Sequence, residues 1–140
     1  MNRWHDDIHE MHAKYGVHEW VKSELNREDK DWSKLNKFMD FRLKFLQEEL
    51  TETQEAFKRG DAPEIVDGLI DLCVVAIGTL DAFNVDAQKA WEQVHSANMK
   101  KEVGVKESRP NPLGLPDLIK PEGWTGPNHD DNTGNIRDAL

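Results

Sequence analysis

The stretch Phe45–Phe57, FLQEELTETQEAF, indicates a helix whose acidic residues fall on its apolar side. With a turn of about 100° per residue and Phe45 at zero, Ala56 lies at about 20°. Glu49 then lies at about 40° and Glu52 at about −20°, close to those apolar residues. Charged residues usually occupy the side opposite to the apolar stripe of a helix. We therefore expect this helix to point carboxylates toward a neighbouring element.

A second acidic helix is predicted at about residues 62–83, after the turn sequence RGDAP. It is apolar almost all round, so we expect it to be buried on most sides. Glu64, Asp67 and Asp71 lie within about 60° of one another on a single stripe. Two consecutive helices thus present acidic ridges, which comprise Glu48, Glu49, Glu52, Glu64, Asp67 and Asp71.

Clustered carboxylates repel one another and lose hydration, so such ridges are unfavourable by themselves. Hard divalent cations such as Mg²⁺ or Mn²⁺ relieve both costs and leave coordination positions open for phosphate oxygens. A lone E-x-x-E pair is usually a solvated helix face, but two pairs on the apolar sides of consecutive helices favour a metal site. Glu55, Lys58 and Arg59 are interpreted as surface charges.

The segments before these ridges predict further helices. Apolar spacing indicates a first helix from Trp4 to Tyr15 that ends at Gly16, and the sequence HEWVKSEL indicates a short second one. Ser33 is the expected N-cap of the long acidic helix, which extends to about Lys58. No convincing strand is evident, so the fold is predicted to be all-α and four-helix-bundle-like.

The C-terminal part of the chain changes in composition. Asp86 is expected to cap a last helix from Ala87 to about Lys101. The rest of the chain holds five of the six prolines and five of the nine glycines, so it is predicted to be extended, with its last dozen residues disordered. We expect a helical domain at residues 1–102 and an extended Pro/Gly-rich tail at residues 103–140 that packs on the domain or on a partner subunit.

The composition excludes several classes of protein. The formal charge of −9 argues against a nucleic-acid or anionic-membrane surface, because both bind clustered Lys and Arg. No apolar run reaches transmembrane length, and no signal peptide is evident. The single Cys73 lies in the apolar run LIDLCVVAI and is expected to be buried. These features predict a cytoplasmic protein without nucleic-acid or membrane partners.

The acidic ridges have the spacing of a known family. Glu49-Leu-Thr-Glu52, eleven further residues and Glu64-Ile-Val-Asp67 resemble the E-x-x-E and E-x-x-D pairs of the MazG-type all-α nucleoside triphosphate pyrophosphohydrolases. The segments RLKFLQEELTE, EIVDGLIDLCVVAIGT and AWEQVHSANMKK resemble the phosphoribosyl-ATP pyrophosphohydrolase-like branch, which occurs in bacteria and their phages. The resemblance covers roughly residues 11–101, and the late KPEGWTGPN is similar to the closing motif of that branch.

The resemblance implies a catalytic metal site. Members hold two or more Mg²⁺ or Mn²⁺ ions, split a nucleoside triphosphate into the monophosphate and pyrophosphate, and form homodimers or homotetramers. Glu48 takes the place of an extra family glutamate, which implies that it activates the attacking water or helps to bind a further ion. The implied metal ligands are Glu49, Glu52, Glu64 and Asp67, and the implied catalytic residues are Glu48 and Glu49.

Several residues are candidates for substrate contacts. Asn98 and Lys101 match a segment of the branch that reaches substrate phosphate or sugar, although Lys101 also fits a solvent-exposed lysine at a helix end. Asp71 fits a ligand, a nucleoside contact or a residue that supports the ligands. Arg42 lies on the carboxylate face, where it fits an ion pair with Glu49, which we prefer, or a phosphate contact.

The N-terminal segment adds aromatic and histidine candidates. Trp20 is a candidate for stacking on the base, whereas Trp32 is interpreted as core packing. The histidines of HDDIHEMH, at residues 5–12, share one helical face that can bind zinc, but surface or packing roles are the more ordinary interpretation. His12 falls within the family-like segment and is expected to face the nucleotide. A lone Glu92-Gln-Val-His95 lacks the second motif that a di-iron bundle needs.

The sequence therefore predicts a metal-dependent enzyme that converts (d)NTP to (d)NMP and pyrophosphate. A deoxynucleotide is the expected substrate, with dGTP first and dCTP or dUTP next, partly because compact members of this kind occur in phages and act in the host cytoplasm. Two alternatives stay open: a phosphoribosyl-ATP pyrophosphohydrolase, and a nucleotide- or alarmone-binding regulatory protein with weak catalysis.

Overall fold

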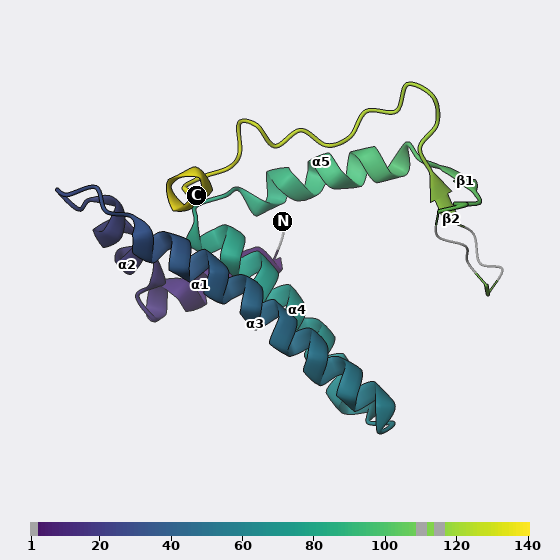
Figure 1. Ribbon diagram of the computed structural model, residues 1–140, viewed down its shortest axis with the longest axis horizontal. Helices are drawn as coiled ribbons and strands as arrows, with labels where there is room; N and C mark the ends of the chain where they lie inside the picture. Colours follow the sequence, from purple (N-terminus) through teal and green to yellow (C-terminus); the bar gives the residue numbers. More distant parts are fainter. Residues whose placement is uncertain (1–2, 109–111, 114–116) are drawn as a thin grey trace. The chain divides into compact units, whose positions relative to one another are not determined.

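The computed structural model of the chain describes residues 3–108, 112–113 and 117–140, and most of these residues are helical (Figure 1). The elements are α1 (Arg3–Lys14), α2 (Val17–Leu25), α3 (Ser33–Lys58), α4 (Ala62–Ala82), α5 (Ala87–Met99), β1 (Glu102–Gly104), β2 (Asp117–Ile119) and the 3-10 helix η1 (Ile136–Ala139). The predicted all-α class is confirmed. Within the described ranges, none of the helices is both long and apolar enough to cross a membrane.

The chain divides into two compact units. The first unit holds Met1–Ala87 and Thr133–Leu140, and the second holds Gln88–Asn132. All of the residues in the predicted acidic ridges belong to the first unit. The predicted boundary between residues 102 and 103 stays a prediction.

The first unit begins with two short helices that meet at a glycine. Gly16 has a backbone φ of 77°, a left-handed conformation that glycine adopts without steric cost. It ends α1 and immediately precedes α2, as the sequence predicts. Both helices contact α4, and α2 also contacts α3.

The main feature of the first unit is the hairpin of α3 and α4, which lie side by side (Figure 1). The Asp61 side chain accepts a hydrogen bond from the Glu64 backbone N–H over 3.2 Å and so caps α4. The start of α3 differs from the prediction: Trp32 occupies the N-cap position, without a side-chain hydrogen bond. Ser33 is already helical, and its N–H donates to Asp31 Oδ1 over 3.1 Å. The aspartate two residues earlier thus replaces the predicted cap.

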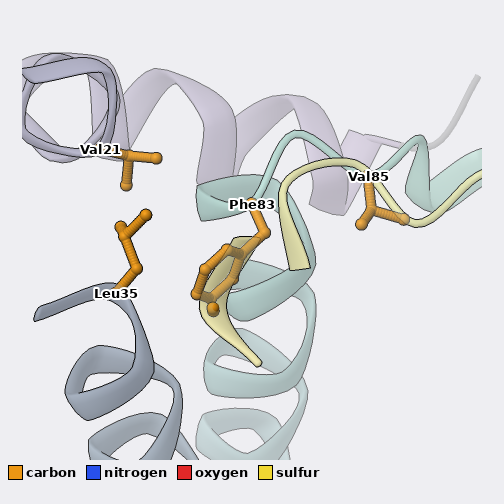
Figure 2. Packing of buried hydrophobic residues seen from close by; sticks show 5 residues of the cluster. Val21, Leu35, Phe83 and Val85 are labelled. Carbon is orange, nitrogen blue, oxygen red and sulfur yellow. The ribbon is translucent and has the colours of Figure 1, made fainter. Parts of the chain in front are cut away.

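A hydrophobic core closes the open end of this hairpin. Figure 2 shows side chains that converge from α2, α3 and the segment after α4. Leu35 and Phe83 are the largest fully buried side chains. Trp32 packs against the same cluster, so its interpretation as a core residue is confirmed. The residues of this core are Val21, Leu35, Phe83, Val85 and Ala139.

The C-terminal residues differ from the prediction of disorder. Ala139 in η1 is 1% exposed and belongs to the core. The Asn36 side chain donates to the Ala139 carbonyl over 2.7 Å, and the Asn135 N–H donates to the Phe83 carbonyl over 2.7 Å. Composition did not reveal these contacts, because they depend on one small apolar residue and on backbone groups.

The outer side of α4 is more exposed than its apolar sequence predicts. Val66 is 64% exposed, Leu69 is 52% exposed and Ile70 is 45% exposed. Cys73 is half-buried rather than fully buried. The reason is geometric, since α4 contacts α1, α2 and α3 on its other sides, and within the first unit no further described element covers this outer side.

The second unit combines α5 with a short hairpin. Strands β1 and β2 pair antiparallel, with Val103 opposite Leu118, and they were not predicted because each has only three residues. The Trp124 indole N–H donates to the Ala97 carbonyl over 2.8 Å and ties the following segment to α5. The Asp86 cap of α5 stays a prediction.

Replacing Leu35 by Ala is expected to lower the free energy of unfolding by about 2–5 kcal/mol, because it leaves a cavity in a fully buried site. Urea unfolding followed by circular dichroism measures this change. Lys37→Ala, on the exposed side of the same helix, serves as the control and should change stability by less than about 0.5 kcal/mol. Equal effects of the two substitutions would contradict the assignment of the core.

Candidate active site between α3 and α4

A pocket of about 180 Å³ lies between the two helices of the hairpin, at the end nearer to their turn. It combines the two acidic ridges that the sequence predicts on separate helices. The lining residues are Glu49, Glu52, Thr53, Glu55, Arg59, Glu64, Asp67, Gly68 and Asp71.

Small residues let the two helices approach at this pocket. Gly68 is buried on α4 and faces Thr53 on α3, so that a Cβ added at position 68 would collide with Thr53 Oγ1. The Thr53 hydroxyl also donates a hydrogen bond to the Glu49 carbonyl of its own helix over 2.7 Å. Ala56, one turn further along α3, is buried. This close approach places the carboxylates of α3 opposite those of α4.

Carboxylates outnumber cations in the lining of the pocket, where Arg59 is the one basic residue among those that the structure describes. Desolvation raises the pKa of Glu49, and the charges of Asp71, Glu52, Asp67 and Glu48 raise it further. A raised carboxylate pKa means that the charged form is disfavoured at this position. All-oxygen donors with excess negative charge suit hard divalent cations, so the residues present fit Mg²⁺ or Mn²⁺.

The carboxylate oxygens are close but not gathered to coordination distance. In the described part of the chain, His9, His18 and Asp81 are the group whose ligand atoms all lie within 4.8 Å of one another, and the acidic pocket forms no such group. Like-charged carboxylates would repel one another at coordination distance.

Two residues of the pocket were not predicted to belong to it. Glu55 and Arg59 are exposed, as their interpretation as surface charges expects, and they also line the pocket. The i, i+3 spacing of Glu49, Glu52 and Glu55 was a signal that placed all three near one edge of the helix. The Arg59 guanidinium forms an ion pair with Asp61 over 3.4 Å, which holds a cation at the rim. Glu48 is exposed beside the pocket and is not among its lining residues.

Arg42 forms hydrogen bonds with α4 in place of the expected ion pair with Glu49. Its Nε donates to Thr79 Oγ1 over 3.0 Å, and its Nη2 donates to the Val75 carbonyl over 2.9 Å. The guanidinium also lies 5.9 Å from the ring centroids of Phe38 and of Phe45. Burial lowers the pKa of Arg42 from its usual value. The sequence placed the residue on the correct face but did not reveal the carbonyl that it contacts.

His12 is buried in a cluster around the carboxylate of Asp81. Its Nδ1 lies 2.8 Å from Asp81 Oδ2. Burial lowers the pKa of His12 from its usual value, in spite of this carboxylate. Burial alone would raise the pKa of Asp81, but hydrogen bonds with His9, His18 and His12 hold it below its usual range. Sequence reasoning missed Asp81, because a single acid near the end of an apolar helix gives no pattern.

The other candidate substrate residues have different surroundings. The Trp20 ring lies 5.2 Å from that of Phe38, and its residue is partly exposed. Asn98 is exposed on α5 in the second unit. The Lys101 ammonium lies 5.5 Å from the centroid of the Trp124 ring in that same unit. The substrate contacts predicted for these residues stay predictions.

In this all-α fold, two neighbouring helices face each other with their acidic residues. This arrangement suits an enzyme that acts on phosphates through divalent cations. A family model described as Phosphoribosyl-ATP pyrophosphohydrolase (PRA-PH) matches residues 15–98. The match covers more than half of the chain and both acidic ridges, and the chain belongs to this family. It is therefore a pyrophosphohydrolase of nucleotides from a metal-dependent family. Comparisons with curated proteins and with solved structures found no match.

Replacing Gly68 by Ala is expected to lower the free energy of unfolding by about 1–3 kcal/mol, because the added methyl group forces α3 and α4 apart. This loss is net of the roughly 1 kcal/mol by which Ala favours a helix over Gly. Urea unfolding measures the change. Thr53→Ala removes the hydroxyl that the methyl group meets, so the double variant should recover part of the loss. A Gly68→Ala variant as stable as the wild type would contradict the close approach.

Proposed function

We propose that the protein converts (d)NTP to (d)NMP and pyrophosphate and thereby controls nucleotide pools in the cytoplasm. The observation that supports this proposal is the pocket in which carboxylates of α3 meet carboxylates of α4. A deoxynucleotide is the proposed substrate, with dGTP first and dCTP or dUTP next. In this reaction, water attacks the α-phosphorus, the bond to the α–β bridging oxygen breaks, and pyrophosphate leaves with that oxygen.

The proposed roles rest on the family resemblance, and the positions of the residues support them. Glu49, Glu52, Glu64 and Asp67 would hold two or more Mg²⁺ or Mn²⁺ ions, which when bound supply charge neutralisation of the polyphosphate and activation of water. Glu48, exposed next to the pocket, would accept the proton of the attacking water. Arg59 at the rim would contact a phosphate oxygen as a fixed cation.

Further residues are proposed to contact the substrate. Asp71 also lines the pocket, which supports a role for it in orienting either an ion or the nucleoside. Arg42 already donates hydrogen bonds to Thr79 Oγ1 and to the Val75 carbonyl. Its proposed role is therefore to set the position of α4 as well as to contact phosphate. The other proposed substrate contacts are Trp20, His12, Asn98 and Lys101.

Phosphoribosyl-ATP is the second candidate substrate, and the matched family description favours it. Its reaction breaks the same type of phosphoanhydride bond, so the acidic pocket supports either substrate. A panel of dNTPs, NTPs and phosphoribosyl-ATP, assayed for pyrophosphate with Mg²⁺ or Mn²⁺, separates the two candidates. Nucleotide binding without release of pyrophosphate from any member of the panel would overturn the enzyme proposal in favour of a regulatory binding protein.

Glu49→Gln and Asp67→Asn are each expected to reduce kcat/KM by about 100-fold or more, because each removes one charged ligand while the shape of the side chain is kept. Pyrophosphate release measures the rate. The stability of the metal-free protein should stay the same or rise, since one source of repulsion is lost. Asp40→Asn is the matched control, because Asp40 lies on the exposed side of α3 in an ion pair with Lys44. Near-normal turnover in either ligand variant would contradict the assignment.

We also propose that the protein is a homodimer or a homotetramer. The exposed apolar residues of α4, Val66, Leu69 and Ile70, support this proposal, because monomers rarely leave neighbouring large apolar side chains in water. Further exposed apolar residues on α3 are Leu43, Leu50 and Phe57.

Light scattering of the wild-type protein should give a mass of two or four chains. Leu69→Lys is expected to shift this mass toward that of a single chain, because it places a charge within the proposed interface. Glu28→Lys, which also introduces a lysine but in the exposed loop after α2, should leave the mass unchanged. A monomeric wild-type protein would refute the proposed assembly.

A further inference from the structure

A group of histidine and aspartate side chains lies away from the acidic pocket, at the C-terminal end of α4. Asp81 lies ten residues beyond Asp71 on the same helix, which corresponds to about 15 Å along its axis. Histidines from α1 and from the start of α2 converge on the Asp81 carboxylate. These histidines are His5, His9 and His12 of α1 and His18 of α2.

The distances in this group are short. His9 Nδ1 lies 2.7 Å from Asp81 Oδ1, and His18 Nε2 lies 2.7 Å from Asp81 Oδ2. The rings of His9 and His18 are 4.4 Å apart between centroids. The ligand atoms of His9, His18 and Asp81 all lie within 4.8 Å of one another, which is the spacing at which one ion can contact all three.

The Asp81 carboxylate is only 3% exposed. A buried carboxylate is unfavourable unless it is paired or bound to a metal. Among the described residues, its ion-pair partners are imidazoles, the nearest being those of His9, His12 and His18. These imidazole nitrogens form hydrogen bonds with the carboxylate. A bound cation would add a fixed positive charge beside it.

We propose that His9, His18 and Asp81 bind one Zn²⁺ ion or a similar borderline transition-metal ion. Two imidazole nitrogens and one carboxylate oxygen are ligands that zinc prefers, whereas Mg²⁺ prefers oxygen alone. The two sites thus differ in their ligand atoms. The acidic pocket offers oxygen alone, whereas this group offers nitrogen and oxygen.

The observed positions require little change to bind such an ion. Ligand atoms about 2.0–2.1 Å from a tetrahedral zinc lie about 3.3 Å from one another, so the two 2.7 Å contacts must open by about 0.6 Å. His9 is 60% exposed at its side chain and has room for this movement. His12, whose Nδ1 lies 2.8 Å from Asp81 Oδ2, keeps the carboxylate oriented as a supporting partner.

The ion would connect three helices. His9 is on α1, His18 is on α2, and Asp81 is in the last turns of α4. Because the ligands are distant in sequence, a bound ion stabilises the folded arrangement and has no equivalent site in the unfolded chain. The proposed role is structural, and it is independent of the proposed hydrolase activity.

The test measures Zn²⁺ binding to the full chain without an affinity tag. Competition with a chromophoric chelator, in excess Mg²⁺ that occupies the acidic pocket, should give one Zn²⁺ per chain. Co²⁺ in place of Zn²⁺ should give the visible absorption of a tetrahedral site with nitrogen ligands. Zn²⁺ at about 100 times its Kd should raise Tm by about 9 °C.

Substitutions locate the binding. His9→Ala combined with His18→Ala should weaken Zn²⁺ binding by about 100-fold or more and abolish the rise in Tm. His95→Ala, at an exposed position of α5, should leave both unchanged. Glu49→Gln combined with Asp67→Asn should also leave Zn²⁺ binding unchanged, which separates this site from the acidic pocket.

Two results would overturn the proposal. One is wild-type protein that binds no Zn²⁺ in the presence of Mg²⁺. The other is Zn²⁺ binding that survives the loss of both histidines. His9→Ala alone decides the matter if circular dichroism shows that the double variant does not fold, since an exposed side chain is not needed for the core.

Discussion

The close packing of α3 against α4 is the constraint on which the rest of the structure depends. The carboxylates of the two helices repel one another and would separate if nothing opposed them. The short turn before Asp61 joins the helices at the acidic end, and Gly68 opposite Thr53 lets their backbones approach there. At the other end, burial of Leu35 and Phe83 supplies the favourable free energy that holds the hairpin together. The acidic pocket is thus electrostatically unfavourable by itself, and the apolar core at the other end of the hairpin offsets this cost.

The hairpin carries three chemically different layers along its length. The apolar core lies at its open end, and the acidic pocket lies near its turn. Between them, Arg42 spans from α3 to Thr79 and to the Val75 carbonyl. This middle layer satisfies buried polar groups that an apolar layer would leave without partners. Asp81 and its histidines extend the polar layer onto α1 and α2.

The two groups of titratable residues differ in how they balance charge. The acidic pocket gathers more negative charge than Arg59 can offset. Desolvation and the neighbouring carboxylates together raise the pKa of Glu49. The Asp81 group shares one carboxylate among several imidazoles, and the lowered pKa of Asp81 reflects its hydrogen bonds. An all-oxygen site and a nitrogen-rich site on one helix would therefore select different ions.

Much of the fold and of the acidic pocket was predictable from the sequence. The period of the apolar residues predicted α3 and α4, and the spacing of Glu49, Glu52, Glu64 and Asp67 predicted a shared acidic surface. This succeeds because a helix converts sequence spacing directly into position on a face. The presence of Glu55 in the pocket was missed, although the same spacing rule applies to it.

The partners of individual side chains were decided only by the tertiary structure. Arg42 was expected to pair with Glu49, and it instead contacts α4 through a threonine and a backbone carbonyl. The sequence pattern did not identify Asp81, but its carboxylate contacts histidines of α1 and α2. The sequence alone determined which faces carry acids, histidines and apolar residues. Which of these faces meet depends on long-range packing, because contacts between distant residues follow from how helices dock and not from the period within any one helix.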